Sequence, residues 1–275
     1  MRAAAILAAA VILAPLGTGA VGVGVMGTGL SGSGAAAQDV PLPERDGLTG
    51  LEWRFVRIRY TTPTDQLAEF LRIYGVDPWT VDAPVAEQNL SRRMARVTTI
   101  QVNEPIVAAL TDDALWEQPW IYIVEPANMM LTDDEVANLR EFLLRGGTVT
   151  FDDFHGPAEW ELFARQMERV FPDRPIVDLG PGHAVFSSFY NLDAYPQIPG
   201  LGSFFNNVTW EKGGFEPKLR AILADDGRAM ALINFNTDMG DGWEWSNAEQ
   251  YPTYVQYTAQ SYRMFINEIV YALTH

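Results

Sequence analysis

The chain has 275 residues, 48% of them hydrophobic, which is enough to bury a substantial core and excludes a disordered chain. Its 35 acidic against 19 basic residues give a formal net charge of −16, which argues against nucleic-acid binding and peripheral membrane binding because phosphate groups are repelled. The lack of cysteine excludes thiolate nucleophiles, cysteine-ligated zinc, iron–sulfur clusters and disulfides.

The first 37 residues have the order of a signal peptide. An apolar run follows Arg2, no charged residue occurs from Ala3 to Gln38, and Ala35-Ala36-Ala37 provides the small residues of a cleavage site. An uncleaved N-terminal anchor is the alternative, because a stretch of this length can span a bilayer, but its second half is rich in glycine. The sequence therefore predicts a cleaved signal peptide over 1–37 and an exported, periplasmic protein.

Two elements are predicted in the first part of the mature chain. Period-two alternation over 53–60 (WRFVRIRY) predicts a strand with one face partly open to water. Apolar residues at helical spacing behind Pro84 predict an amphipathic helix over 85–97. Its arginines are Arg92, Arg93 and Arg96. They fall on its other faces, where we expect them to form a solvated rim.

The next segment predicts a strand followed by a well-capped helix. The continuous apolar run IYIV at 121–124 is typical of a parallel strand covered on both faces. Thr132 and Glu135 have the spacing of a capping box, which predicts that a helix begins at Asp133. Gly146-Gly147 marks its end.

The alternation continues beyond this helix. TVTF at 148–151 predicts a further strand, 152–157 a loop, and Pro157 stands in the first turn of another helix. Strands and helices that alternate with short loops predict an α/β fold in which helices cover both faces of a mostly parallel sheet.

The C-terminal third is less regular. A short strand is predicted at 176–179, and 180–217 is a long loop rich in glycine, proline and aromatic residues. Asp225-Asp226-Gly227 predicts the turn of a hairpin, and apolar spacing from Tyr262 to Leu273 predicts a terminal helix. No linker interrupts the chain, so we predict a short lead at 38–47 and one domain over 48–275.

Several motifs in order carry a resemblance to a known family. They are FVRIRY at 55–60, Asn89-Leu90, Gly146-Gly147 with Asp152-Asp153, HAVFSSFY at 183–190 and NEIVYALT at 267–274. Together they resemble the bacterial domain-of-unknown-function family 4159, whose activity is not established, and Ala184 departs from the proline that is usual there. The resemblance implies a class-I glutamine-amidotransferase-like fold, a flavodoxin-type three-layer sandwich. Class-I amidotransferases attack glutamine with a thiolate, which this chain lacks.

The main candidate site follows the strand at 148–151. Ligand crevices of open α/β sheets lie beyond the carboxyl ends of the strands, and Asp152, Asp153 and His155 stand there. They could hold a hard divalent ion or act as acid and base. Alternatively, one aspartate caps the next helix, the other binds loop amides and the histidine only packs. Neighbouring strand residues point to opposite faces, so both aspartates share a crevice only if the backbone turns.

Three further features are weaker candidates. His183 could hang from the long loop over the same crevice, or be a packed imidazole bonded to the backbone. The acidic segment from Asp238 to Glu244 could bind calcium, but it lacks the spacing of an EF-hand loop. Aromatic residues crowd the last third and could stack on a flat ligand, or cover the sheet edge and the terminal helix.

These features leave three classes of function open. The leading hypothesis is a non-catalytic protein that binds a small molecule, a glycan or a protein in the crevice. The alternative is a hydrolase of a glycan or amide that uses Asp152, Asp153, His155 or His183, assisted by a divalent cation where one is bound. The third is a partner module with an apolar surface patch. No other cofactor is predicted.

Overall fold

The computed structural model describes residues 46–247 and 249–275, so the predicted signal peptide and most of the predicted lead lie outside the described residues. A seven-stranded sheet has the strand order β4-β2-β5-β6-β9-β8-β7, in which β8 alone runs antiparallel to the others. Its strands are β2 (Val56–Ile58), β4 (Ile106–Ala108), β5 (Trp120–Val124), β6 (Thr148–Phe154), β7 (Ile176–Asp178), β8 (Lys218–Leu223) and β9 (Ala229–Phe235). The predicted α/β class is confirmed.

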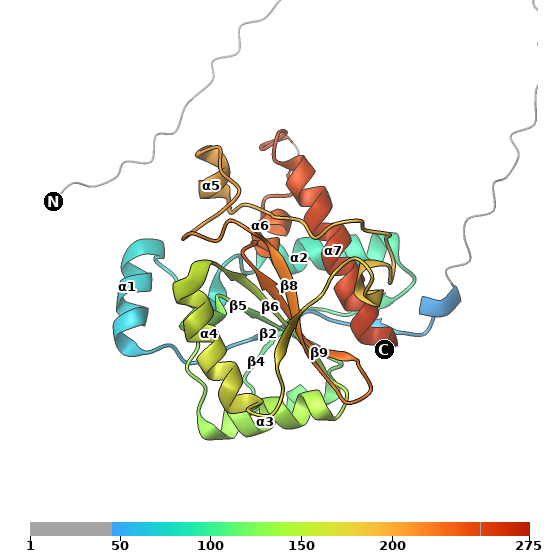
Figure 1. The fold of residues 1–275 in the computed structure, drawn as a ribbon. Helices are drawn as coiled ribbons and strands as arrows, with labels where there is room; N and C mark the ends of the chain where they lie inside the picture. The colour runs from blue at the N-terminus through green and yellow to red at the C-terminus, as the bar shows by residue number, and fades with distance from the viewer. Residues whose placement is uncertain (1–45, 248) are drawn as a thin grey trace, which may run out of the picture. The chain divides into compact units, whose positions relative to one another are not determined.

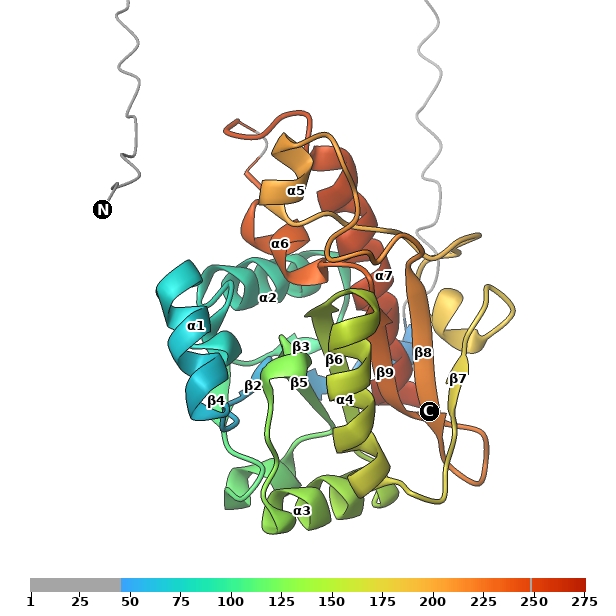
Figure 2. The same ribbon diagram turned by 60° about the vertical axis from the view of Figure 1, so that its left-hand side comes forward.

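Helices cover both faces of this sheet (Figures 1 and 2). On one face lie α3 (Asp133–Leu144) and α4 (Gly156–Val170), and on the other lie α2 (Val85–Val97), α6 (Met239–Glu244) and α7 (Val255–Thr274). Residues of β5 alternate between the two resulting cores, Ile121 and Ile123 in the first, Trp120 and Tyr122 in the second. Both faces of β5 are buried, which explains its continuous apolar run.

Apart from α1, the remaining elements are short. β1 (Glu52–Trp53) and β3 (Gln101–Val102) pair in a separate parallel sheet. The other helices are α1 (Thr64–Tyr74), α5 (Leu201–Phe205) and the 3-10 turns η1 (Asp46–Leu48), η2 (Pro78–Thr80), η3 (Asp113–Glu117), η4 (Pro126–Asn128) and η5 (Ala184–Phe186). Among the described residues, no helix combines the length and apolarity needed to cross a membrane.

The predicted strand over 53–60 is wrong in two respects. The segment divides into β1 and β2, which belong to different sheets, and β2 has no face open to water. The reason is Arg57, which is only 1% exposed because it forms an ion pair with Glu87 on α2. A charged residue at an expected solvent position is therefore part of the core.

The predicted capping box is confirmed at the start of α3. The Thr132 hydroxyl oxygen accepts a hydrogen bond from the Glu135 amide (3.3 Å), and the Glu135 carboxylate accepts one from the Thr132 amide (2.8 Å). Two amides that helical bonds leave unpaired are thus satisfied.

We expect Thr132→Ala to lower the free energy of unfolding by about 1 kcal/mol, because the cap is lost while the apolar face of α3 stays intact. Urea denaturation measures the change. Thr253→Ala is the control, since Thr253 is exposed and does not cap a helix. Equal losses in the two variants would contradict this prediction.

β6 is longer than predicted. The predicted strand ends at Phe151, but β6 runs on to Phe154, so Asp152 and Asp153 lie inside a strand rather than in a loop. Between Phe151 and Phe154 its register with β9 shifts, and Asp153 has φ 58°. The irregularity places Phe151 and Phe154 in the same core, which strict alternation would not allow.

Candidate functional site

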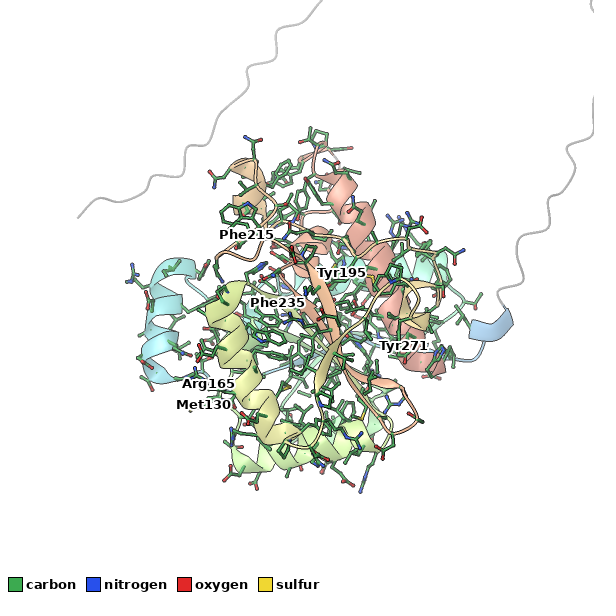
Figure 3. The ribbon with its side chains drawn as sticks, viewed as in Figure 1. Met130, Arg165, Tyr195, Phe215, Phe235 and Tyr271 are labelled. Atoms are coloured by element: carbon green, nitrogen blue, oxygen red, sulfur yellow. The ribbon has the colours of Figure 1, made fainter. Side chains whose placement is uncertain are left out.

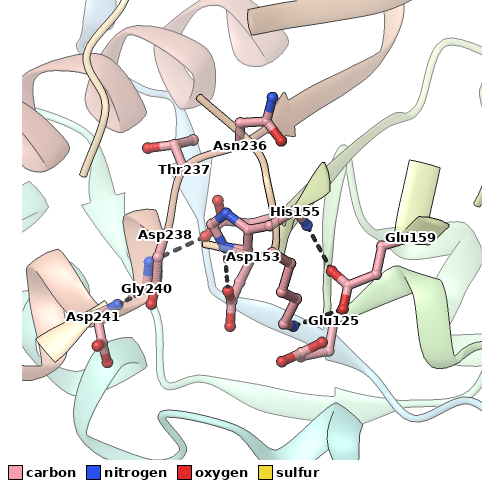
Figure 4. Close-up of polar contacts among 12 residues, drawn as sticks. Glu125, Asp153, His155, Glu159, Asn236, Thr237, Asp238, Gly240 and Asp241 are labelled. Atoms are coloured by element: carbon pink, nitrogen blue, oxygen red, sulfur yellow. Dashed lines mark hydrogen bonds and ion pairs between the residues drawn. The ribbon is translucent and has the colours of Figure 1, made fainter. Parts of the chain in front are cut away.

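Acidic residues stand at the carboxyl ends of three neighbouring strands (Figure 4). Glu125 directly follows β5, Asp152 and Asp153 lie near the end of β6, and Asp238 follows β9 by three residues. The strand ends are tied together, because the Glu125 amide donates to the Asp152 carbonyl oxygen at 3.0 Å. This is the edge at which open α/β sheets place their ligands.

The backbone is strained at the same edge. Asp82, Glu125, Asp153, Lys212 and Asn236 have φ between 48° and 64°, and they are five of the six non-glycine residues with positive φ in the described part of the chain. Such conformations cost about 1–3 kcal/mol each, and they persist where the surroundings enforce them, typically at functional sites.

Asp152 joins β6 to α6. Its carboxylate accepts hydrogen bonds from the Tyr122 hydroxyl (2.9 Å) and from the amides of Met239 (3.3 Å) and Gly240 (3.0 Å). The side chain is fully buried, and burial together with the charge of Asp153 raises its pKa to about 7. Two of these neutral donors belong to the first turn of α6, so Asp152 fixes the position of this helix against β6.

Asp153 and His155 form a pair, with Asp153 Oδ1 at 3.1 Å from His155 Nε2. Burial alone would lower the pKa of His155, but the hydrogen bond and charge of Asp153 outweigh it and raise the pKa. His155 is only 1% exposed, and its Nδ1 has no partner among the described residues. The backbone irregularity at Asp153, with φ 58°, therefore accompanies a side chain that points toward the imidazole.

Neither aspartate caps α4. The helix begins behind His155, whose side chain makes no capping bond; instead Glu159 accepts from the His155 amide at 2.6 Å. Glu159 also pairs with Lys212 at 2.6 Å. Burial would lower the pKa of Lys212, but Glu125, Glu159 and Asp153 raise it. The ammonium therefore stays charged beside these acids.

A second group of carboxylates lies next to this pair. Asp82, Asp241 and Glu244 can each place one oxygen within 4.8 Å of the others, a spacing that suits a metal ion. Asp82 Oδ2 is buried and has no hydrogen-bond partner in the described structure. A Cβ on Gly240 would lie 2.0 Å from that oxygen, so glycine is needed for the carboxylate to approach the backbone.

These carboxylates repel one another in a poorly solvated place. Burial and then the charge of neighbouring aspartates raise the pKa of Asp82 and Asp238 well above the usual range, and that of Asp241 to about 7. Burial and the charge of Asp153 likewise raise the pKa of Glu125 well above its usual range. Each of these groups would be stabilised as a carboxylate by a nearby cation.

His183 does not reach this site, so a place over the same crevice, one of its two interpretations, is wrong. Its ring packs against Tyr271 (centroids 5.3 Å apart), and the Tyr271 hydroxyl accepts from the amide of Ala229, the first residue of β9. β9 is parallel to β6, so this is the opposite end of the sheet from Asp152. Figure 3 shows Tyr271 far from Phe215, which lies near the start of β8.

The predicted acidic turn at 238–244 is the helix α6. Asp238 Oδ1 accepts a hydrogen bond from the Asp241 amide at 2.8 Å and caps the first turn of α6.

The sequence did not connect this segment to Asp152 and Asp153, and it did not reveal Glu125 or Asp82 as site residues. For Glu125 the available signal was an acid placed just after the predicted strand at 121–124, and for Asp82 the sequence offers none. Among the clustered aromatic residues, Trp243 and Tyr254 are buried, as expected of a covering role.

Comparison with known proteins gives one family. The family described as "Domain of unknown function (DUF4159)" matches residues 55–273, which include every residue of the crevice described above. No curated protein matches the chain.

Proposed function

This chain belongs to the DUF4159 family, and we propose that it is an exported ligand-binding protein whose crevice holds a divalent cation between Asp82, Asp241 and Glu244. One observation carries the proposal. Asp82 Oδ2 is buried without a hydrogen-bond partner in the described residues, within reach of two other carboxylates. An orphaned buried oxygen of this kind is costly, and a bound cation would satisfy it.

The chemistry of the donors favours a hard cation. All three candidate ligands are carboxylates, and oxygen donors suit Mg²⁺ or Ca²⁺, which keep several positions for water or a bound ligand. Arg57 brings a positive charge near Asp82 and Glu244, but it is already paired with the buried carboxylate of Glu87. We infer that the open positions of the cation take an oxygen-bearing small molecule or glycan, or a protein carboxylate.

Binding without catalysis is the reading that burial supports best. The resemblance to family 4159 implies a class-I glutamine-amidotransferase-like fold, but this chain has no thiol with which to attack glutamine. The Asp153–His155 pair is 7% and 1% exposed, so a substrate could not reach the imidazole without movement of the surrounding chain.

A hydrolase is the second candidate, and the 3.1 Å contact between Asp153 and His155 favours it. Asp153 would orient the imidazole, and the unpartnered His155 Nδ1 would take a proton from water. A cavity of about 410 Å³ begins at Gly156 and is walled by Trp160 and Phe215, an arrangement suited to a sugar ring.

Calorimetric titration of the purified protein with MgCl₂ and CaCl₂ tests the cation site. We expect saturable binding that weakens about tenfold or more in Asp241→Asn, because a neutral amide is a poorer ligand than a carboxylate. Asp193→Asn removes an exposed carboxylate from the long loop and should leave the affinity unchanged. Absence of binding, or equal weakening of the affinity in both variants, would contradict the proposed cation site.

The hydrolase alternative has its own test. Turnover of chromogenic glycosides or amides that is lost in His155→Gln, while the fold is retained by circular dichroism, would replace the binding proposal with an enzymatic one. Absence of turnover in the presence of a bound cation supports binding alone.

A further inference from the structure

A separate cavity of about 530 Å³ lies between α2, α7 and the end of α6. Arg92, Arg93 and Arg96 line it from α2, and Thr258 and Tyr262 line it from α7. None of these residues belongs to the carboxylate crevice. In a chain with a net charge of −16, three arginines within five residues create a local positive surface.

The three guanidinium groups are available to a ligand. They are exposed, and none of the ion pairs found within the described ranges uses them. Arg93 lies over the ring of Tyr262, 4.8 Å from its centroid, and Arg92 donates to Asn89 Oδ1 at 2.5 Å. These contacts orient the two side chains while leaving most of their N–H groups free.

A second observation points to a ligand. Thr258 is only 5% exposed, and its hydroxyl has no hydrogen-bond partner in the part of the chain that the structure describes. It lies on the wall of the arginine cavity. A buried hydroxyl without a partner costs about 1–3 kcal/mol, and a small shift of the side chains that cover it would let an acceptor held in the cavity satisfy it.

We propose that this cavity binds the phosphate group of a small phosphate monoester. Phosphate carries close to two negative charges and three acceptor oxygens, which match several guanidinium forks and a hydroxyl better than a single carboxylate does. The Tyr262 ring and Val255 provide an apolar wall for the organic part of the ligand. The same phosphate chemistry could be presented by a free metabolite or by a lipid headgroup.

Titration calorimetry with glycerol 3-phosphate, at low salt and with EDTA present, tests the proposal independently of the cation site. We expect saturable binding that weakens about tenfold or more in the double variant Arg93→Gln/Arg96→Gln, and more mildly in Thr258→Val, which keeps the shape but not the hydroxyl. Arg72→Gln, an exposed arginine on α1, is the control and should bind as the wild type does.

The source of the phosphate is decided by a parallel experiment. Sedimentation with phosphatidic-acid vesicles that depends on Arg93 and Arg96, with weak binding of glycerol 3-phosphate, would assign the site to a lipid headgroup. Binding of glycerol 3-phosphate without sedimentation would assign it to a free monoester. If neither probe binds, or if the double variant and Arg72→Gln behave alike, the proposed phosphate site is overturned.

Discussion

Glu87→Ala is expected to lower the free energy of unfolding by about 3–5 kcal/mol, because it leaves the guanidinium of Arg57 buried without its carboxylate. Arg57 and Glu87 are 1% and 5% exposed and form an ion pair between β2 and α2. Arg57 also donates to the carbonyl oxygens of Trp79 (3.2 Å) and Val81 (3.0 Å), which do not neutralise its charge. Urea denaturation followed by tryptophan fluorescence measures the loss.

Two comparisons separate this effect from general damage. The double variant Arg57→Met/Glu87→Leu removes both charges at similar volume and should regain most of the lost stability. Glu69→Ala breaks an exposed pair with Arg72, whose nearest atoms are 3.6 Å apart, and should cost less than about 1 kcal/mol. If Glu87→Ala were as mild as Glu69→Ala, the buried charge would not be held as described.

The Arg57–Glu87 ion pair also affects the geometry of the proposed cation site. The two carbonyl oxygens that Arg57 holds belong to the segment that leads to Asp82, so the ion pair fixes the approach of this carboxylate to α6. We therefore expect the proposed cation affinity to fall in Glu87→Ala even where the protein remains folded.

Local signals accounted for much of the fold. The capping box at Thr132, the turn at Asp225-Asp226-Gly227 and the apolar spacing of α2 depend on residues within one or two turns, and each element formed where it was predicted. The burial of Arg57 could not be predicted in this way. Its partner is thirty residues away in the sequence, and a period-two pattern cannot distinguish a charged residue in water from one that is paired.

The candidate site was predicted in part for the same reason. Asp152 and Asp153 follow an evident strand, so the rule for carboxyl ends found them. Glu125 also follows a predicted strand and could have been found by the same rule, whereas Asp82 reaches the crevice through a left-handed backbone conformation, which no sequence pattern signals in a non-glycine residue. His183 was misplaced because nothing in a long loop indicates to which end of the sheet it returns.

Without added cation, stability is expected to fall as the pH rises from about 4 to about 8. The folded pKa of Asp152 and of Asp241 is about 7, above the ordinary value of 3.8, because burial disfavours their charged forms. Because the folded pKa is raised, each carboxyl contributes its full stabilisation below its ordinary pKa of 3.8. This contribution to the free energy of unfolding is lost as the pH rises through 7. Each group contributes up to about 4 kcal/mol to the free energy of unfolding at low pH. This pH dependence is opposite to that of carboxylates in ion pairs, which stabilise the fold at high pH.

Cation binding should reverse this loss, because Mg²⁺ or Ca²⁺ competes with protons for the same oxygens. In EDTA the urea midpoint should be higher at about pH 5 than at about pH 8, and Asp241→Asn should flatten the profile. At about pH 8, a cation at a hundredfold excess over its Kd should add about 2.7 kcal/mol, and at about pH 5 much less, while NaCl of equal ionic strength should not reproduce this difference. A stability that rises with pH in EDTA would mean that these carboxylates are already neutralised within the fold, and the crevice would then need no cation.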